Sequence, residues 1–244
     1  MTIFYVPQSH PICPANQTDQ PSLLCNDGPL TCPDALSHLL PDGRLQCNVV
    51  TRCANLLPAF ELVSQRGERK PLALIEIGAS AGLNLYWDLY HYRYGHLTVG
   101  NNLSPVHLHC TLKGRQRPGL PTVMPEIASR VGIDFFPLDV TNEQHVSWLS
   151  ACIRPEETER FRAFTAALQF AQEHSPRLLA GDACHLLPDL LDAMPPEATI
   201  CLWHSYALAQ GPACVYQQIV QLFTAFSRMR CDSFSPNWPR PGDD

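Results

Sequence analysis

The sequence predicts an α/β protein whose central sheet is doubly wound and mainly parallel. From about residue 45 onward, short apolar runs alternate with segments of helical periodicity, which is typical of β-α-β units with a parallel sheet. The apolar run Leu72–Ile77 ends in a glycine-rich turn, as such strands commonly do before a helix. With 244 residues, the chain suits one domain of this kind rather than two.

Composition and charge narrow the class of protein. Hydrophobic residues make up 45% and charged residues 16% of the chain, which is the balance of a globular domain. The formal net charge of -6 provides no broad positive field, so no nucleic acid is indicated as a partner, although a local basic patch is left open. No segment approaches the roughly 18 consecutive apolar residues of a membrane span, and we expect no membrane association.

The cysteines favour a cytoplasmic protein. There are eleven, an odd number, and no two of them form a Cys-x-x-Cys pair. Disulfide-rich secreted domains and structural zinc sites both use paired spacings, so reduced thiols fit better and no metal site is expected. His107 and His109 alternate on one strand face as metal ligands can, but a solvated strand face is the preferred interpretation.

Composition divides the chain into three regions. Residues 1–44 contain seven prolines and scattered turn formers, which predict an irregular extension. Residues 45–230 carry the strand and helix patterns and form the expected domain. Residues 231–244 are rich in serine and proline and are expected to be a disordered tail.

The first part of the domain predicts a strand between two helices, and then an insertion. Apolar residues at steps of three and four predict a helix over 48–65. The short, mainly apolar run Leu72–Ile77 suits a strand that is buried on both faces. A second helix is expected after the glycine-rich turn, through Tyr92. In the insertion, we expect a hairpin between residues 97–99 and 106–112.

The second part of the domain alternates strands and helices. Three apolar runs predict strands over 133–140, 177–180 and 199–203, the last ending at His204. Helical patterns follow each of these runs: one over residues 155–173, a short leucine-rich one over 186–191, and one that opens at Pro212.

The glycine-rich turn Glu76–Gly82 is the strongest functional motif. Gly78 and Gly82 allow a sharp turn and the close approach of a ligand to the backbone at a helix N-terminus. Glu76 is placed to accept hydrogen bonds from a ligand ammonium group or from the loop itself. The alternative interpretation is a tight strand-to-helix turn without a ligand.

This turn resembles the first motif of S-adenosylmethionine-dependent methyltransferases, an acidic residue followed by a Gly-x-x-x-Gly loop. Residues from about 45 to 230 also resemble a bacterial protein family of unknown function, through these segments: Asn48 to Arg52, Glu76 to Leu85, Ser104 to Val106, Pro137 to Asp139, Gly181 to Ala183 and Trp203 to Ser205. The resemblance implies a Rossmann-like, methyltransferase-like fold and no established activity.

The methyltransferase resemblance implies a role for several residues toward S-adenosylmethionine. Gly78, Ser80 and Gly82 would face the amino-acid end of the cofactor. Asp182 would contact the adenine amino group, with the backbone amide of Ala183 beside it. The acid that holds the ribose normally lies about twenty residues after the loop. Asp139 is the candidate for that position, although it comes much later in the chain.

A methyltransferase sheet has seven strands, whereas the sequence yields four. We therefore expect the sheet to be incomplete toward the C-terminus, with an exposed edge beside the fourth strand. Such an edge would favour self-association. The methyl acceptor is not indicated by any feature of the sequence.

Two other functions compete with a methyltransferase. Gly78 to Gly82 also satisfies Gly-x-Ser-x-Gly, the nucleophile elbow of α/β-hydrolases, with Ser80 as nucleophile. Asp182 and His204 follow in the hydrolase order, but too few strands precede the elbow. A non-catalytic binding protein that retains the fold is the third alternative.

Three further residues are candidates for the site. His204 ends the fourth strand at the edge where ligands of open α/β sheets bind, and it is the predicted proton-handling residue. Asn48 and Arg52 lie one helical turn apart and share a helix face. The family resemblance favours a place near the site for both, and the alternative is a surface hydrogen bond.

Overall fold

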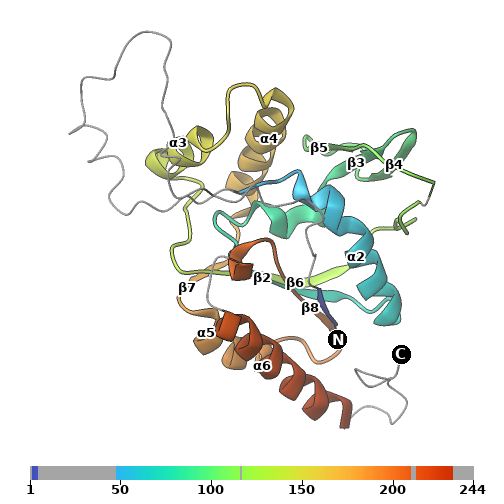
Figure 1. Ribbon diagram of the computed structural model, residues 1–244, viewed down its shortest axis with the longest axis vertical. Coiled ribbons are helices and arrows are strands. Elements are labelled where there is room, and N and C mark those ends of the chain that lie inside the picture. Colours follow the sequence, from blue (N-terminus) through green and yellow to red (C-terminus); the bar gives the residue numbers. More distant parts are fainter. Residues whose placement is uncertain (1, 5–47, 116, 210–212, 233–244) are drawn as a thin grey trace. The chain divides into compact units, whose positions relative to one another are not determined.

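The computed structural model describes residues 2–4, 48–115, 117–209 and 213–232 (Figure 1). Most of the extension expected over residues 1–44 and the tail expected at the C-terminus lie outside the described residues. Within that extension, Thr2–Phe4 form strand β1. In the described ranges, no helix has the length and apolar character needed to cross a membrane.

The central sheet has five parallel strands in the order β1-β8-β2-β6-β7. After β1, its four other strands are β2 (Leu72–Ile77), β6 (Ile127–Asp134), β7 (Leu178–Ala180) and β8 (Thr199–His204). Counted along the chain from β2, these four stand in the spatial order 3-2-1-4. The α/β class with a mainly parallel sheet is therefore confirmed.

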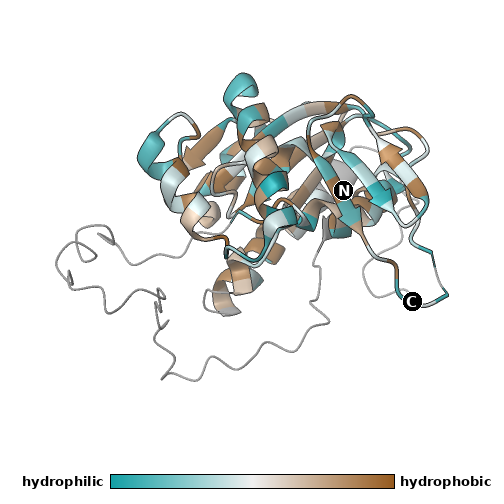
Figure 2. Ribbon diagram, turned by 90° about the horizontal axis from the view of Figure 1, so that it is seen from above, coloured by the Kyte–Doolittle hydropathy of each residue, from teal (hydrophilic) through white to brown (hydrophobic). Residues whose placement is uncertain are grey.

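Helices cover both faces of this sheet, which explains why every residue of β2 and β8 is buried. On one face lie α2 (Arg52–Arg66), the 3-10 helix η1 (Leu83–Leu89) and α4 (Thr158–His174), packed on Leu74 and Trp203. On the other lie α5 (Ala183–Asp192) and α6 (Ala213–Asp232) (Figure 1). Hydrophobic and hydrophilic residues alternate along these helices (Figure 2), as expected where one side is buried.

The insertion forms a second sheet that differs from the expected hairpin. Its strands are β3 (His91–Tyr94), β4 (Leu97–Gly100) and β5 (His107–Cys110), in the order β4-β3-β5. The two expected strands do not pair with each other, because β3 lies between them. The expected helix ends at Leu89 because Tyr92 and Tyr94 alternate with polar residues, and this period-2 pattern buries the rings in a strand.

The second strand of the domain was misplaced by about six residues in the sequence-based prediction. We expected residues 133–140, whereas β6 ends at Asp134. The Asp134 carboxylate accepts the Phe136 N–H at 2.9 Å, a side-chain turn that ends the strand. Pro137 has no N–H to continue a ladder.

The segment between β6 and β7 contains two helices rather than the single one expected. Helix α3 (Glu143–Ala151) begins at Asn142, whose side chain accepts the backbone N–H groups of Gln144 and His145. Helix α4 begins at Thr158, three residues after Pro155. Helix α3 was not predicted from the sequence, although Asn142 is a typical N-cap residue.

The sheet edge expected to be open beside the fourth strand is occupied. β1 pairs with β8 in parallel, with Thr2 opposite Cys201 and Phe4 opposite Trp203. Residues from the start of the chain thus complete this side of the sheet, a pairing that no local sequence pattern indicates. The prediction of an exposed edge beside β8 is therefore wrong, and self-association stays a prediction.

Candidate functional site

The candidate site lies at the carboxyl edge of the central sheet. The loop 78–82 follows β2, and the segment 205–209 follows β8. From β7 the chain crosses back over β6 and β2 to form β8, so the strand order reverses between β2 and β8. Open α/β sheets bind ligands in the crevice at such a reversal. The two segments therefore define the place to look for a ligand.

Most backbone N–H groups of the glycine-rich loop are already used within the protein. Those of Gly78 and Ala79 donate to the Ile133 carbonyl at 2.8 and 3.2 Å. That of Ser80 donates to the Asp134 carboxylate at 2.8 Å. A phosphate cradle needs such groups to face the ligand. The loop is therefore not arranged as a phosphate-binding loop.

Both glycines of the loop are required by conformation and by packing. Gly78 and Gly82 have φ values of +74° and +72°, a region that side chains disfavour. A Cβ atom at Gly78 would lie 2.2 Å from the Cβ of Ala207, and one at Gly82 would lie 2.9 Å from that of Pro176. Contacts within the chain thus account for both residues, and their role toward a cofactor stays a prediction.

Asp134 occupies the position for which the sequence analysis selected Asp139. It is the last residue of β6, and its two oxygens accept the N–H groups of Ser80 and Phe136. Its carboxylate therefore joins the loop after β2 to the loop after β6. The sequence signal was an acid at the end of the apolar run, three residues before Pro137.

Asp139 lies farther along the same loop, in a different environment. It is exposed and accepts hydrogen bonds from the Thr141 N–H at 2.8 Å and hydroxyl at 2.7 Å, which lower its pKa. It lines a cavity of about 270 Å³ between residues 137–141 and 175–178. The Leu138 N–H donates to the Ser80 carbonyl, so this cavity adjoins the glycine-rich loop.

Two aromatic rings stand next to Asp134. Phe135 and Phe136 are 62% and 46% exposed, which is unusual for large apolar side chains beside a sheet edge. Because residues 133–140 were predicted to be a strand, these two rings were not predicted to be surface groups. Exposed rings beside a carboxylate offer a surface for a flat heteroaromatic ligand.

Asp182 and Ala183 are the N-cap and the first residue of helix α5. The Asp182 carboxylate accepts the Cys184 N–H at 2.8 Å and so caps the helix. Ala183 is the first helical residue and is buried. The Gly181 N–H donates to the Asp134 carbonyl at 2.9 Å, which brings the loops after β6 and β7 together.

Glu76 is fully buried and faces the layer of α2 and η1. Its carboxyl accepts a hydrogen bond from Asn84 Nδ2 at 3.3 Å. Burial raises its pKa to about 8, against the opposing effect of hydrogen bonds from Asn84 and Trp203 and of the Arg52 charge. With 0% of its surface exposed, Glu76 contacts residues inside the protein, such as Asn84 after the loop.

Asn48 and Arg52 join the two segments that define the site. Asn48 Nδ2 donates to the Ala79 carbonyl at 3.2 Å. One Arg52 nitrogen donates to both the carbonyl and the hydroxyl of Ser205 at 3.1 Å, and the guanidinium lies 4.5 Å from the centre of the Tyr206 ring. Both residues lie at the reversal of strand order, the place that the family resemblance favoured.

Two buried polar atoms near these contacts lack a hydrogen-bond partner among the described residues. They are Ser80 Oγ and Asn48 Oδ1, on residues that are 6% and 7% exposed. Buried polar groups are almost always paired, so each such group requires an explanation. The hydroxyl belongs to the residue after Ala79, and the amide oxygen belongs to the side chain that binds the Ala79 carbonyl. The two atoms suit a small polar ligand.

His204 ends β8 and is 7% exposed. It lies opposite Ile77 in the sheet register and so faces the layer of α5 and α6. Its ring centre is 6.4 Å from that of Tyr216 in an edge-on arrangement. Burial disfavours the charged imidazolium and lowers its pKa, so its imidazole is neutral at pH 7.

Arg52 should hold the segment after β8 in a strained conformation. Tyr206 has a φ of +73°, which costs a non-glycine residue on the order of 1 kcal/mol. We expect Arg52→Ala to lower the free energy of unfolding by about 1–3 kcal/mol, because hydrogen bonds from a charged donor are lost. Hydrogen exchange of residues 205–209 should become faster.

Arg66→Ala is the matched control, since Arg66 is exposed at the other end of the same helix. It should change the free energy of unfolding by less than about 0.5 kcal/mol. Equal hydrogen exchange of residues 205–209 in the two variants would show that Arg52 does not hold the segment.

Among the described residues, no group of three or more His, Cys, Asp or Glu side chains is arranged to hold a metal ion.

Comparison with known proteins places the chain in a family without assigning an activity. No curated protein and no solved structure matches the chain. One family model matches residues 15–233, and the expected resemblance to a bacterial family of unknown function is thereby confirmed. The chain belongs to DUF2332, a family of uncharacterized proteins conserved in bacteria.

Proposed function

We propose that this protein binds S-adenosylmethionine at the edge between β2 and β8 and is a methyltransferase with a Rossmann-like fold. One observation carries the proposal. In a sheet of order 3-2-1-4, the glycine-rich loop, Asp134, Asp182 and His204 stand at the carboxyl ends of the first, second, third and fourth strands of the domain. Nucleoside cofactors bind at this edge in doubly wound sheets.

The side chains at this edge suit a nucleoside without phosphate groups. The loop amides are engaged within the protein, which disfavours a dinucleotide, since its pyrophosphate requires them. Asp134 offers a carboxylate acceptor for ribose hydroxyls, and Phe135 and Phe136 offer rings for adenine. Ser80 Oγ and Asn48 Oδ1 offer a donor and an acceptor for the amino-acid end.

Binding at Gly78 requires the segment 205–209 to move. Ala207 packs where a ligand would approach Gly78, and Arg52 holds that segment through Ser205. The unfavourable φ of Tyr206 reduces the cost of leaving this conformation. We therefore assign Arg52 to the closing of the site.

The bound cofactor would supply a methyl group activated by a sulfonium. The contribution of the protein is to position an acceptor in line and, where that acceptor is protonated, to remove its proton. His204 is the proposed proton acceptor, because burial keeps its imidazole neutral at pH 7 and it ends the strand beside the loop.

The hydrolase alternative draws support from one feature. Ser80 has a φ of +53°, and strained backbone is typical of a nucleophile elbow. However, Ser80 Oγ contacts no base among the described residues, and Asp182 caps α5. Apart from β2 itself, β1 is the one described strand that precedes the loop in the chain. A serine-reactive phosphonate that labels Ser80 would favour this alternative.

The test is cofactor binding by the full chain. At a concentration about 100-fold above its Kd, a ligand adds about 2.7 kcal/mol to the free energy of unfolding, which raises Tm by roughly 5–10 °C in a chain of this size. We expect this shift with S-adenosylmethionine and S-adenosylhomocysteine, and none with NAD. No shift and no calorimetric heat at millimolar cofactor would contradict the proposal and favour a non-catalytic binding protein.

A further inference from the structure

The small sheet presents a solvent-facing side that the proposed function does not use. Its inner side buries Tyr92 and Leu108, and the Tyr94 hydroxyl donates to the Ala54 carbonyl of α2. The alternate residues of β3 and β5 point the other way. Arg93 and His109 are exposed on that outer side.

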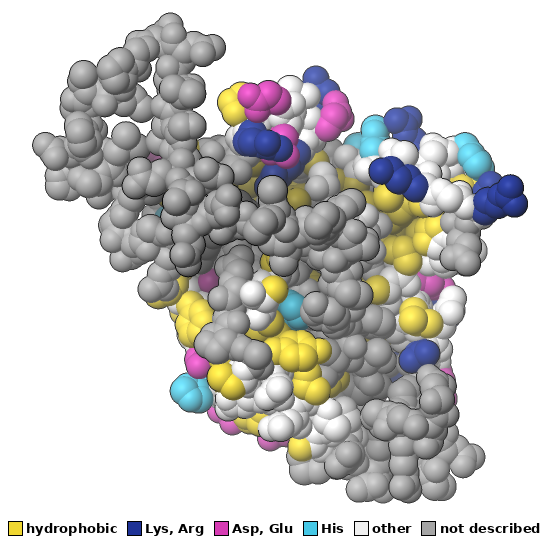
Figure 3. All heavy atoms as spheres, in the orientation of Figure 1, with side chains coloured by type: hydrophobic (Ala, Val, Ile, Leu, Met, Phe, Trp, Pro, Cys, Tyr) yellow, Lys and Arg dark blue, Asp and Glu magenta, His cyan; other side chains and the backbone are white. Residues whose placement is uncertain are grey.

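The segment that builds this sheet has an unusual charge. Residues 89–125 contain no Asp or Glu, although the whole chain carries a net charge of -6. The segment holds eight Lys, Arg and His side chains: Arg93, Lys113, Arg115, Arg117, His91, His96, His107 and His109. Figure 3 shows Lys, Arg and His side chains gathered over β3–β5 with no acidic side chain among them. The sheet is thus a local cationic surface on an acidic protein.

Imidazole rings and the Arg93 guanidinium lie close together on this surface. The rings of His91 and His107 lie 4.9 Å apart between centres, and an Arg93 nitrogen is 3.3 Å from His109 Nδ1. Burial lowers the pKa of His91, as do His107, His109 and Arg93 around it. His91 is therefore an uncharged ring at pH 7, beside the permanent charge of Arg93.

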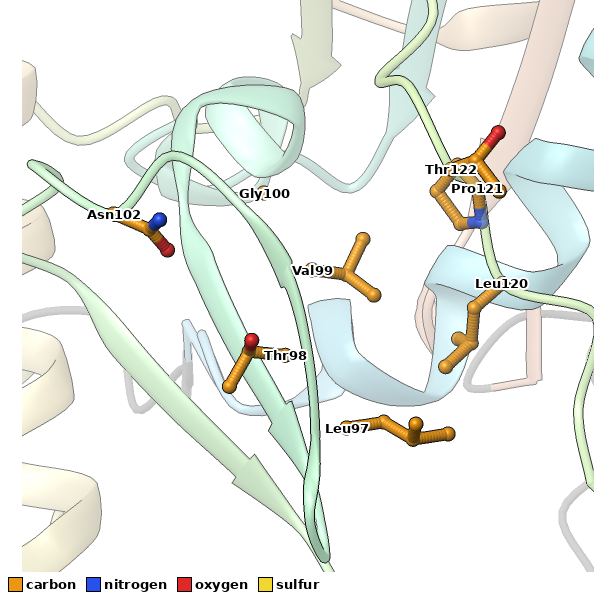
Figure 4. Close-up of a pocket in the computed structure, with 8 residues that line it drawn as sticks. All are labelled: Leu97, Thr98, Val99, Gly100, Asn102, Leu120, Pro121 and Thr122. Carbon is orange, nitrogen blue, oxygen red and sulfur yellow. The ribbon is translucent and has the colours of Figure 1, made fainter.

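A cavity of about 410 Å³ opens at the edge of the same sheet, along strand β4. Leu97 and Val99 stand opposite Tyr94 and Tyr92 in the register and line it from the inner side, while Thr98, opposite Arg93, lines it from the outer side. Figure 4 shows Leu97, Val99 and Leu120 pointing toward one another across it, with Thr122 near its rim. Its volume is in the range of small-molecule sites, which is about 300–1,000 Å³. An apolar floor with a hydroxyl at the rim suits a flat ring that carries polar edges.

From this combination we infer that the small sheet binds single-stranded nucleic acid, independently of the proposed cofactor. Arg93, Lys113 and Arg115 contact phosphates, His91 and His107 provide stacking faces, and the cavity beside β4 receives a base. Single-stranded sites combine cations for the backbone with rings for the bases in this way. Both kinds of group are present here within one sheet.

An anionic membrane fits this surface less well. Membrane-binding surfaces place apolar groups at the centre of the cationic patch. Here the exposed apolar residues Leu103 and Val123, 91% and 75% exposed, lie in loops outside the strands. The strand surface itself carries imidazoles, a guanidinium and the Thr98 hydroxyl, which are groups for stacking and hydrogen bonding.

The test measures fluorescence anisotropy of a labelled RNA strand of about 20 nucleotides, a length that exceeds typical single-strand sites, with the full chain. The variant Arg93→Glu/Lys113→Glu/Arg115→Glu should weaken binding at least tenfold. It should also reduce the slope of log K against log salt by about 2, because three phosphate contacts are lost. The control Arg66→Glu/Arg154→Glu/Arg162→Glu makes the same charge change at exposed residues elsewhere and should bind like the wild type.

The cavity has its own test. Thr122→Trp, at an exposed position, should fill the cavity and weaken RNA binding about tenfold, the size of one lost base contact. Binding of an abasic strand should be unaffected by this change. Equal loss with the abasic strand would overturn the assignment of the cavity to a base.

Three results would overturn the nucleic-acid inference as a whole. The first is RNA binding by the small-sheet triple variant that equals the wild type, and the second is equal loss in both triple variants. The third is binding of the wild type to vesicles of phosphatidylserine and phosphatidylcholine without binding to RNA. If the triple variant does not fold, two other measurements test the inference. They are RNA binding by Lys113→Glu, a single change in the loop after β5, and the salt dependence of RNA binding by the wild type. Because no cofactor is added, failure here leaves the methyltransferase proposal untouched.

Discussion

Replacing Arg130 with methionine should lower the free energy of unfolding by about 3–5 kcal/mol, as expected when one partner of a buried ion pair is removed. Arg130 of β6 pairs with Asp88, whose side chain is 6% exposed. Arg130 Nε also donates to the Leu85 carbonyl at 3.1 Å, which attaches η1 to the sheet. Burial raises the pKa of Asp88 to about 6 although Arg130 opposes it, so loss of Arg130 leaves a carboxyl that must be buried alone.

The matched control is Arg162→Met. Arg162 pairs with Glu159 on the surface of α4, with side chains 74% and 75% exposed. Exposed pairs contribute about 0–1 kcal/mol, so this change should be nearly neutral in urea denaturation. Similar losses for the two variants would show that the Arg130–Asp88 pair does not anchor the strand to η1.

Glu76→Gln should remove a strong pH dependence of stability. The folded-state pKa of Glu76 is about 8, above its ordinary value of 4.5. Between these values the folded protein retains a proton that the unfolded chain has released. The stability contributed by Glu76 is therefore complete below pH 4.5 and is lost as pH rises through 8. The slope is about 1.4 kcal/mol per pH unit.

Urea denaturation of wild type and Glu76→Gln at several pH values between about 5 and 8 checks this slope. As pH rises, the free energy of unfolding of the wild type should fall relative to that of Glu76→Gln by about 1.4 kcal/mol per pH unit. The exposed Glu173→Gln variant should follow the wild type at every pH. A difference between Glu76→Gln and wild type that is independent of pH would mean that Glu76 is ionised in the folded protein.

The strands that are buried on both faces could be predicted from the sequence. The bounds of β2 agree with the expected ones, and β8 differs by one residue at its end. Their continuous apolar runs are bounded by glycine, proline or polar residues, which leaves little choice of position. The alternation of strands and helices then fixed the α/β class.

Errors arose where a local side-chain interaction competed with hydrophobicity. The run after Asp134 contains Phe135, Phe136 and Leu138 and so read as a strand, but the Asp134 turn and Pro137 end the ladder. The same error replaced Asp134 with Asp139 in the candidate site. The packing of Ala207 on Gly78 joins segments far apart in the chain, and no local pattern encodes it.

The most direct test of the proposed function is isothermal titration of S-adenosylmethionine into the wild type, Asp134→Asn and Asp139→Asn, with melting curves to verify that each is folded. The two variants make the same chemical change five residues apart, at the end of β6 and in the loop that follows it. We predict that the wild type and Asp139→Asn bind with similar Kd. Asp134→Asn should bind about 10- to 100-fold more weakly, the effect of losing a hydrogen bond to a charged acceptor. No binding to the folded wild type, or equal Kd for the wild type and Asp134→Asn, would contradict the proposed site.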